Sequence, residues 1–116
     1  GALSNGTAAR WHVKPFDASS AMALFEQANP EGYAATCEAI AGTDFYTPTS
    51  GLRLPTLAIA GPLDGATPPD LVRETADLIP GSQFHLIKGA GHIAPHTHPA
   101  EFAAALKTFL GKIGHV

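Results

Sequence analysis

Apolar residues in the second half of the chain fall into two short runs, each followed by a glycine-rich stretch. Residues 55–60 read Pro-Thr-Leu-Ala-Ile-Ala and end at Gly61. A short apolar run of this kind is typical of a parallel strand that is buried on both faces. Residues 83–87, Gln-Phe-His-Leu-Ile, predict a second strand, which ends at the Lys-Gly-Ala-Gly segment 88–91.

A helix is predicted between the two strands. Thr67 at the N-cap, Pro68 at the first helical position and Asp70 three residues after the cap form a typical helix start. The following positions place one apolar stripe along the helix, and Pro80-Gly81 ends it. The stripe consists of Leu71, Val72, Leu78 and Ile79.

The last helix is predicted from Pro99 to about Lys112, with an apolar side formed by Phe102, Leu106, Phe109, Leu110 and Ile113. Strands that alternate with helices imply a parallel sheet covered by helices, so residues 51–116 form a β-α-β-α unit. Two parallel strands leave much of their faces and edges uncovered. We therefore expect further strands from upstream in the same protein or from another chain.

Residues 1–50 have a helical pattern instead. Asp17 can cap a helix over residues 18–28, and Asn29 can cap the next helix, with Pro30 at its first position. One face of that second helix is predicted to pack, and it carries Tyr33, Cys37, Ile40 and Ala41. The segment has three expected breaks, at Pro15, at residues 29–30 and at residues 47–51.

Composition narrows the classes of function. The 116 residues are 45% hydrophobic and 15% charged, which is typical of one globular unit. A net charge of −3 provides no basic surface for nucleic acid and no polybasic anchor for a membrane. No apolar run reaches the ~20 residues of a membrane span, and no signal-peptide pattern is present. The single cysteine, Cys37, fits a reducing compartment, so we expect a cytoplasmic location.

Each predicted strand is followed by a loop with one residue suited to proton transfer. Asp64 lies in the loop 61–67, and His92 lies in the loop 89–93. In open α/β sheets the site lies outside the carboxyl ends of the strands, so neighbouring strands would bring Asp64 and His92 together. A carboxylate bonded to one ring nitrogen of histidine fixes its tautomer and leaves the other nitrogen to accept a proton.

Simpler roles exist for both residues, since an aspartate often caps a turn and a histidine often lies on a surface loop. Their equivalent positions after consecutive strands favour the paired interpretation. A metal site is a further alternative, because His92, His96 and His98 form an H-x3-H-x-H cluster. Pro95 and Pro99 argue against a helix that would bring these histidines onto one face, so we expect neither a metal nor another cofactor.

Residues 54–69 followed by Gly-Ala-Gly-His at 89–92 resemble the end of an α/β-hydrolase. The resemblance covers residues 52–112 and implies the C-terminal part of that fold, with residues 1–50 as a helical cap and 51–116 as the end of the core. In this family the triad follows the order Ser, Asp, His, which makes Asp64 the acid and His92 the base. Many members carry Glu just before the proline that follows the base, where this chain has Thr97-His98-Pro99.

Arg10-Trp11 and residues 30–40 are similar to the cap of 3-oxoadipate enol-lactonases, although His12 replaces a common Phe. This narrower resemblance implies hydrolysis of a small lactone or ester, with 3-oxoadipate enol-lactone as the best guess and Trp11 in the substrate pocket. Arg10 or Lys14 would then hold an anionic substrate. The alternatives are another α/β-hydrolase esterase and a non-catalytic, hydrolase-like binding or interaction module.

A nucleophile is not evident. Ala-Leu-Ser-Asn-Gly at 2–6 places Ser4 before Gly6 but lacks the first glycine and the preceding strand of a nucleophile elbow. Cys37 lies in the middle of a predicted helix and is a poorer candidate. We therefore expect the half of the core that carries the nucleophile to be absent from this chain. The expected partner is that missing half, and the alternative is self-association.

Overall fold

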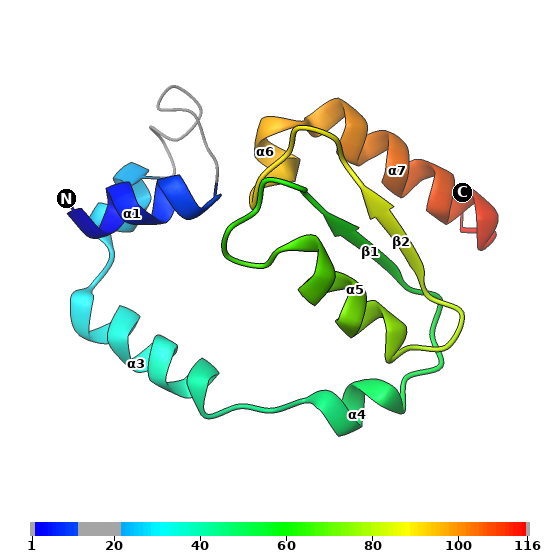
Figure 1. The fold of residues 1–116 in the computed structure, drawn as a ribbon, viewed down its shortest axis with the longest axis horizontal. Coiled ribbons are helices and arrows are strands. Elements are labelled where there is room, and N and C mark those ends of the chain that lie inside the picture. Colours follow the sequence, from blue (N-terminus) through cyan, green and yellow to red (C-terminus); the bar gives the residue numbers. More distant parts are fainter. Residues whose placement is uncertain (1, 12–21, 116) are drawn as a thin grey trace.

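A computed structural model describes residues 2–11 and 22–115, with only the backbone described for residues 2–5 and 8. Two strands and seven helical segments follow one another along these residues (Figure 1). They are α1 (Ala2–Trp11), a helical stretch at 22–27, α3 (Pro30–Ala41), α4 (Tyr46–Ser50), β1 (Leu57–Ala60), α5 (Pro69–Asp77), β2 (Gln83–Leu86), α6 (Ala94–Thr97) and α7 (Pro99–Lys112).

The two predicted strands pair as predicted. β1 and β2 form a parallel sheet in the register Leu57 to Gln83 through Ala60 to Leu86. The Gln83 amide donates to the Thr56 carbonyl at 2.9 Å, and the Ile87 amide donates to the Ala60 carbonyl at 3.0 Å. Each strand is shorter than the apolar run that predicted it, because the pairing covers only four residues of each strand.

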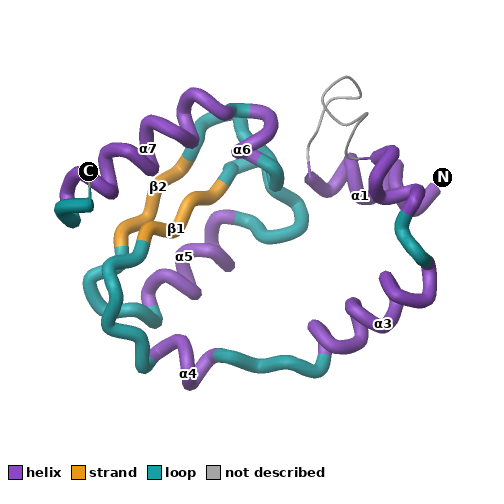
Figure 2. Tube along the Cα trace, turned by 180° about the vertical axis from the view of Figure 1, so that it is seen from behind, coloured by secondary structure: helices purple, strands orange, loops and turns teal. Residues whose placement is uncertain are grey.

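The helices α5 and α7 lie on opposite sides of this sheet in Figures 1 and 2. On one side, the guanidinium of Arg73 from α5 lies 4.2 Å above the ring of Phe84 from β2. On the other, Ile59 of β1 and Phe102 of α7 pack against a small core of Ile87, Ala90 and Ala94. The β-α-β-α prediction for residues 51–116 therefore describes the observed layers.

The expectation that β1 is buried on both faces is wrong for the described part of the chain. Leu57, Ala58 and Ile59 are only half-buried, and the described residues contain no third strand. The accessible surface is 7805 Å², against about 6,000 Å² for a compact monomer of this mass. The radius of gyration is 15.9 Å, against about 13 Å expected for this length. No residue of α3 or α4 is buried, so these two helices do not complete a closed core around the sheet.

Capping explains where two helices begin. Asn29 caps α3 as predicted, since its Oδ1 accepts the Gly32 amide at 2.9 Å and Pro30 is the first helical residue. By contrast, Pro68 is the N-cap of α5, and Thr67 does not cap this helix. The predicted start was one residue too early because the Thr67 hydroxyl is bonded to Asp64 instead.

Other predictions for the first half are only partly met. Within the predicted helix 18–28, residues 22–27 are helical, and Asp17 and residues 18–21 lie outside the described residues. The expected break at 47–51 contains the short helix α4, whose Tyr46 hydroxyl bonds the carboxylate of Glu74 on α5. The predicted packing face of α3 makes one ring contact, between Tyr33 and Phe25 with centroids 5.1 Å apart, but no residue of α3 is buried. None of the described helices is long and apolar enough to cross a membrane.

Gly61, directly after β1, lies against the backbone of the loop that follows β2. A Cβ atom there would lie 2.5 Å from the Gly91 carbonyl oxygen and closer still to that of Ala90. We expect Gly61→Ala to lower the free energy of unfolding by about 1–3 kcal/mol, because backbone atoms must move to admit the methyl group.

Gly111→Ala is the matched control, because nothing lies within 4 Å of the added Cβ and the position is inside α7. Urea unfolding followed by circular dichroism measures both variants. Equal stability of the two variants would contradict the close approach at Gly61.

Candidate active site

The loops after β1 and β2 lie against each other at one end of the sheet. The Leu63 amide in the first loop donates to the Ala90 carbonyl in the second at 3.0 Å. Within the first loop, the Asp64 amide donates to the Gly61 carbonyl at 3.1 Å and closes a tight turn. Because parallel strands end on the same side, this turn brings the Asp64 side chain toward the second loop.

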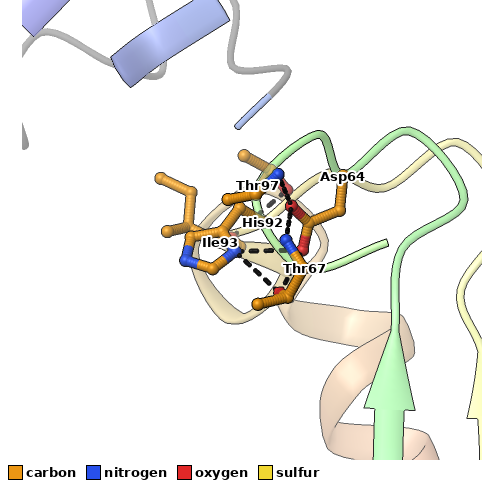
Figure 3. A network of polar contacts seen from close by, with 6 residues as sticks. Asp64, Thr67, His92, Ile93 and Thr97 are labelled. Atoms are coloured by element: carbon orange, nitrogen blue, oxygen red, sulfur yellow. Dashed lines mark hydrogen bonds and ion pairs between the residues drawn. The ribbon is translucent and has the colours of Figure 1, made fainter. Parts of the chain in front are cut away.

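Asp64 and His92 are in direct contact, as expected from their positions after the strands. His92 Nδ1 lies 2.9 Å from Asp64 Oδ2 (Figure 3). The Asp64 side chain is 5% exposed, whereas the His92 side chain is 30% exposed. The pair thus consists of a buried carboxylate and an imidazole that solvent or a substrate can reach.

Three further donors from its own loop surround the Asp64 carboxylate. Oδ1 accepts the amides of Ala66 at 2.8 Å and of Thr67 at 3.0 Å. Oδ2 accepts the Thr67 hydroxyl at 2.9 Å in addition to the ring of His92. The carboxylate is therefore held in one orientation by its own loop.

The pKa of Asp64 is lowered below its ordinary value of 3.8. Burial alone would raise this pKa, but the hydrogen bonds from the Thr67 amide, the His92 ring, the Ala66 amide and the Thr67 hydroxyl stabilise the charged form more strongly. Asp64 is consequently a carboxylate at neutral pH, and it accepts a hydrogen bond from the protonated Nδ1 of His92. Its contribution to folding stability is present above its unfolded pKa of about 3.9 and is lost as the pH falls through the lower folded value.

The hydrogen bond to Asp64 determines the tautomer of His92. A carboxylate can only accept, so Nδ1 carries the proton and Nε2 keeps a lone pair. Thr67 Oγ1 lies 3.3 Å from Nδ1 and, having donated its own proton to Asp64, can only accept from it. In Figure 3 the other ring nitrogen points away from Asp64. An imidazole in this state can take up a proton at Nε2 while the carboxylate stabilises the positive charge.

Thr67 is a site residue that sequence reasoning assigned to a different role, that of helix cap. Its hydroxyl contacts both members of the pair. The spacing Asp-x-x-Thr contains the signal, because an aspartate in a tight turn accepts the backbone amides two and three residues later and so draws that threonine close.

Trp11, at the end of α1, lies beside His92. The ring centroids are 4.9 Å apart with an interplanar angle of 36°, and the His92 amide donates to the Trp11 carbonyl at 2.8 Å. The preceding carbonyl, of Arg10, accepts the Gly65 amide at 2.6 Å. The Arg10 guanidinium bonds the Thr7 hydroxyl at 3.1 Å, and Lys14 and His12 lie outside the described residues.

A cavity of about 240 Å³ adjoins the pair, lined by Asp64, Thr67 and His92 together with apolar residues of β1, α5, α6 and α7. A larger cavity of about 440 Å³ lies between the sheet and α7 and does not touch the pair. Of these two cavities, the smaller is the one that Asp64 and His92 line.

Known structures share the fold of this chain. An enol-lactonase from Burkholderia xenovorans LB400 is 29% identical, with a TM-score of 0.81 over 95% of this chain and 44% of that one. A thermophilic esterase from Thermogutta terrifontis is 28% identical, with a TM-score of 0.87 over 100% of this chain and 45% of that one. The fold is that of the C-terminal part of an α/β-hydrolase.

Curated sequences agree with this assignment. A pimeloyl-[acyl-carrier protein] methyl ester esterase from Photobacterium profundum is 30% identical over 84 residues, which cover 72% of this chain and 33% of that protein. No protein-family model matches the sequence. The chain thus spans a third of this relative and less than half of the two α/β-hydrolase structures.

The other candidate residues are placed as follows by the backbone and, where described, the side chains. Ser4 falls inside α1 rather than on a turn between a strand and a helix, and its side chain lies outside the described residues. Cys37 is exposed on α3.

The prolines beside the predicted histidine cluster lie at helix starts: Pro95 lies in the one-turn helix α6, and α7 begins at Pro99. Among the described residues, no three His, Cys, Asp or Glu side chains converge as a metal site would require.

Replacing Thr67 by valine removes the hydroxyl and keeps the shape of the side chain. We expect Thr67→Val to raise the pKa of Asp64, because the charged carboxylate loses one of its donors. A carbon-13 NMR titration of the Asp64 carboxyl measures this shift. Thr67→Ser keeps the hydroxyl and is the control. An unchanged titration in Thr67→Val would show that the bond to Thr67 does not act on Asp64.

Proposed function

We propose that the protein containing this chain is a serine hydrolase in which Asp64 is the triad acid and His92 the triad base. The contact between His92 Nδ1 and Asp64 Oδ2 at 2.9 Å is the observation that supports this role most directly. The buried, multiply bonded carboxylate and the accessible imidazole match the different tasks of an acid that orients and a base that reacts. The likeness to an esterase and an enol-lactonase supports the same reaction class.

In the proposed reaction, Nε2 of His92 takes the proton of a serine hydroxyl as the serine oxygen attacks the carbonyl carbon of the substrate. Asp64 stabilises the resulting imidazolium through Nδ1. The imidazolium then gives its Nε2 proton to the leaving oxygen, and the bond between that oxygen and the carbonyl carbon breaks. His92 next takes a proton from a water molecule as the water oxygen attacks the acyl carbon. The bond between that carbon and the serine oxygen breaks, and Nε2 returns its proton to the serine oxygen, which leaves the free acid and the original serine.

The serine and the oxyanion-hole amides would come from outside the described residues. Ser50 and Ser82 bond main-chain carbonyls of Thr47 and Ala76, away from the pair. Thr67 lies near His92, but on the Nδ1 side, where the proton is already shared with Asp64. None of these hydroxyl groups can serve Nε2.

The partner we propose is the N-terminal half of the hydrolase core. One strand of that half would pair with the edge of β1 that faces away from β2. Bonds from Gln83 to Thr56 and from Ile87 to Ala60 show that the even-numbered residues face β2. In a parallel strand the amides and carbonyls alternate in direction, so those of Leu57 and Ile59 face the opposite edge. Pairing of two copies of this chain at the same edge is the alternative outcome.

We propose a small lactone or ester as the substrate and 3-oxoadipate enol-lactone as the first compound to test. Residues 1–50 would act as the cap. Trp11 is not among the residues that line the 240 Å³ cavity, but its ring lies against His92, so it would contact the substrate from the cap side of the base. Arg10, directly before Trp11, is exposed and could approach an anionic group. A pimeloyl ester esterase and an enol-lactonase resemble the chain to nearly the same degree, so a panel of lactones and esters is required.

In the intact protein, which supplies the nucleophile, we expect Asp64→Asn and His92→Ala to lower kcat by about 10³- to 10⁴-fold, because the base loses its orienting partner or is absent. Hydrolysis of enol-lactone and of p-nitrophenyl esters measures the loss. Asp77→Asn and His115→Ala, both exposed and away from the pair, are matched controls. Near-normal turnover in Asp64→Asn and His92→Ala would exclude the triad.

For the chain alone, we expect no hydrolysis of activated esters above the rate of the buffer, because the nucleophile is missing. A p-nitrophenyl acetate assay with Ser4→Ala as the comparison measures this. Turnover that disappears in Ser4→Ala would identify Ser4 as the nucleophile. Turnover that persists in Ser4→Ala and in His92→Ala would place the reaction at another site.

A further inference from the structure

The end of helix α1 makes two main-chain hydrogen bonds that the proposed reaction does not account for. The last four carbonyls of a helix have no partner within the helix. At the end of α1, the Arg10 carbonyl accepts the Gly65 amide at 2.6 Å and the Trp11 carbonyl accepts the His92 amide at 2.8 Å. One bond thus reaches the residue after the acid, and the other reaches the base itself.

We propose that the C-terminal end of α1 positions the Asp64–His92 pair, with Gly65 and Trp11 as the positioning residues. We call the two hydrogen bonds and the ring contact between Trp11 and His92 the α1 clamp. Its role in catalysis rests on the proposed function, whereas its contacts do not.

Gly65 allows the helix to come this close. A Cβ atom at Gly65 would lie 2.8 Å from the Arg10 carbonyl oxygen and 3.4 Å from Arg10 Cα, both of them backbone atoms. Gly65 is not among the glycines with positive φ, so its conformation does not itself require glycine. The missing side chain is therefore needed for the approach of α1.

The α1 clamp restrains His92 from a direction that Asp64 does not. Asp64 holds one ring nitrogen, the Trp11 carbonyl holds the backbone amide, and the indole lies 4.9 Å from the imidazole. Rotation of the His92 side chain would break the bond to Asp64 and the ring contact together. The carbonyl end of a helix also favours nearby positive charge, which His92 carries after it accepts a proton.

Both bonds connect α1 to loops and not to strands. In Figures 1 and 2 the end of α1 lies beside the loops that follow β1 and β2. A movement of α1 away from the sheet would therefore release the acid loop at Gly65 and the base at His92 at once. The proposed cap and the proposed base would be coupled through this contact.

Trp11 is the only tryptophan, so its fluorescence reports on the contact directly. An imidazolium quenches indole emission on contact far more than a neutral imidazole does. We expect emission to fall in one step on acidification from pH 8 to pH 5, because a proton on the His92 ring places a positive charge 4.9 Å from the indole. Asp64 stays charged over this range because its pKa is lowered. His12 follows Trp11 in the sequence and could also quench it, so the same titration is recorded on His92→Gln, which should lose the step.

We expect Gly65→Ala to lose most of the step that depends on His92, because its methyl group separates Trp11 from the ring. Gly111→Ala adds the same methyl group where nothing lies within 4 Å and should keep the full step. A full step in Gly65→Ala would overturn the role of Gly65. A wild-type step that is unchanged in His92→Gln would overturn the contact itself.

Amide hydrogen exchange on the unmodified chain tests the clamp if Gly65→Ala does not fold. The amides of Gly65 and His92 should be protected and should exchange together with those of α1. Exchange as fast as in an unfolded peptide would overturn the proposal. Neither measurement needs substrate or nucleophile, so a failed clamp and a failed hydrolase assignment give different results.

Discussion

A carboxylate that is almost wholly removed from water requires donors for its oxygens, and this requirement orders both loops at the end of the sheet. Asp64 accepts hydrogen bonds from two backbone amides and a hydroxyl of its own loop, and from a ring nitrogen of the other loop. No buried side-chain nitrogen or oxygen among the described residues lacks a partner. The tight turn after Asp64 and the placement of the His92 ring both supply donors to this one charge.

The sequence was most informative where a short-range rule determines the structure. The apolar runs predicted both strands, Asn29 predicted the start of α3, and the position of Asp64 and His92 after consecutive strands predicted their contact. Each of these depends on a local pattern or on the parallel order of neighbouring strands. The α/β-hydrolase fold follows from the same residues.

The sequence was least informative where two demands compete for one residue or where distant segments meet. Thr67 satisfied the rules for a helix cap, yet a buried carboxylate three residues earlier is the stronger acceptor for its hydroxyl. The apolar face of α3 predicted burial, but helical spacing does not specify what will cover a face. The approach of α1 to Gly65 joins segments that no local pattern connects.

The α1 clamp also bears on the order in which the chain folds. The β1–α5–β2 unit brings together residues that are close in sequence, so its contact order is low and its closure entropy small. The bonds from Gly65 and His92 to α1 instead close loops that include much of the chain. Only a few contacts offset the loss of chain entropy on closing these loops. We therefore expect the sheet and its acid–base pair to form early and α1 to dock last. The helix that positions the base would then be the final step of folding and the first part of the structure to open.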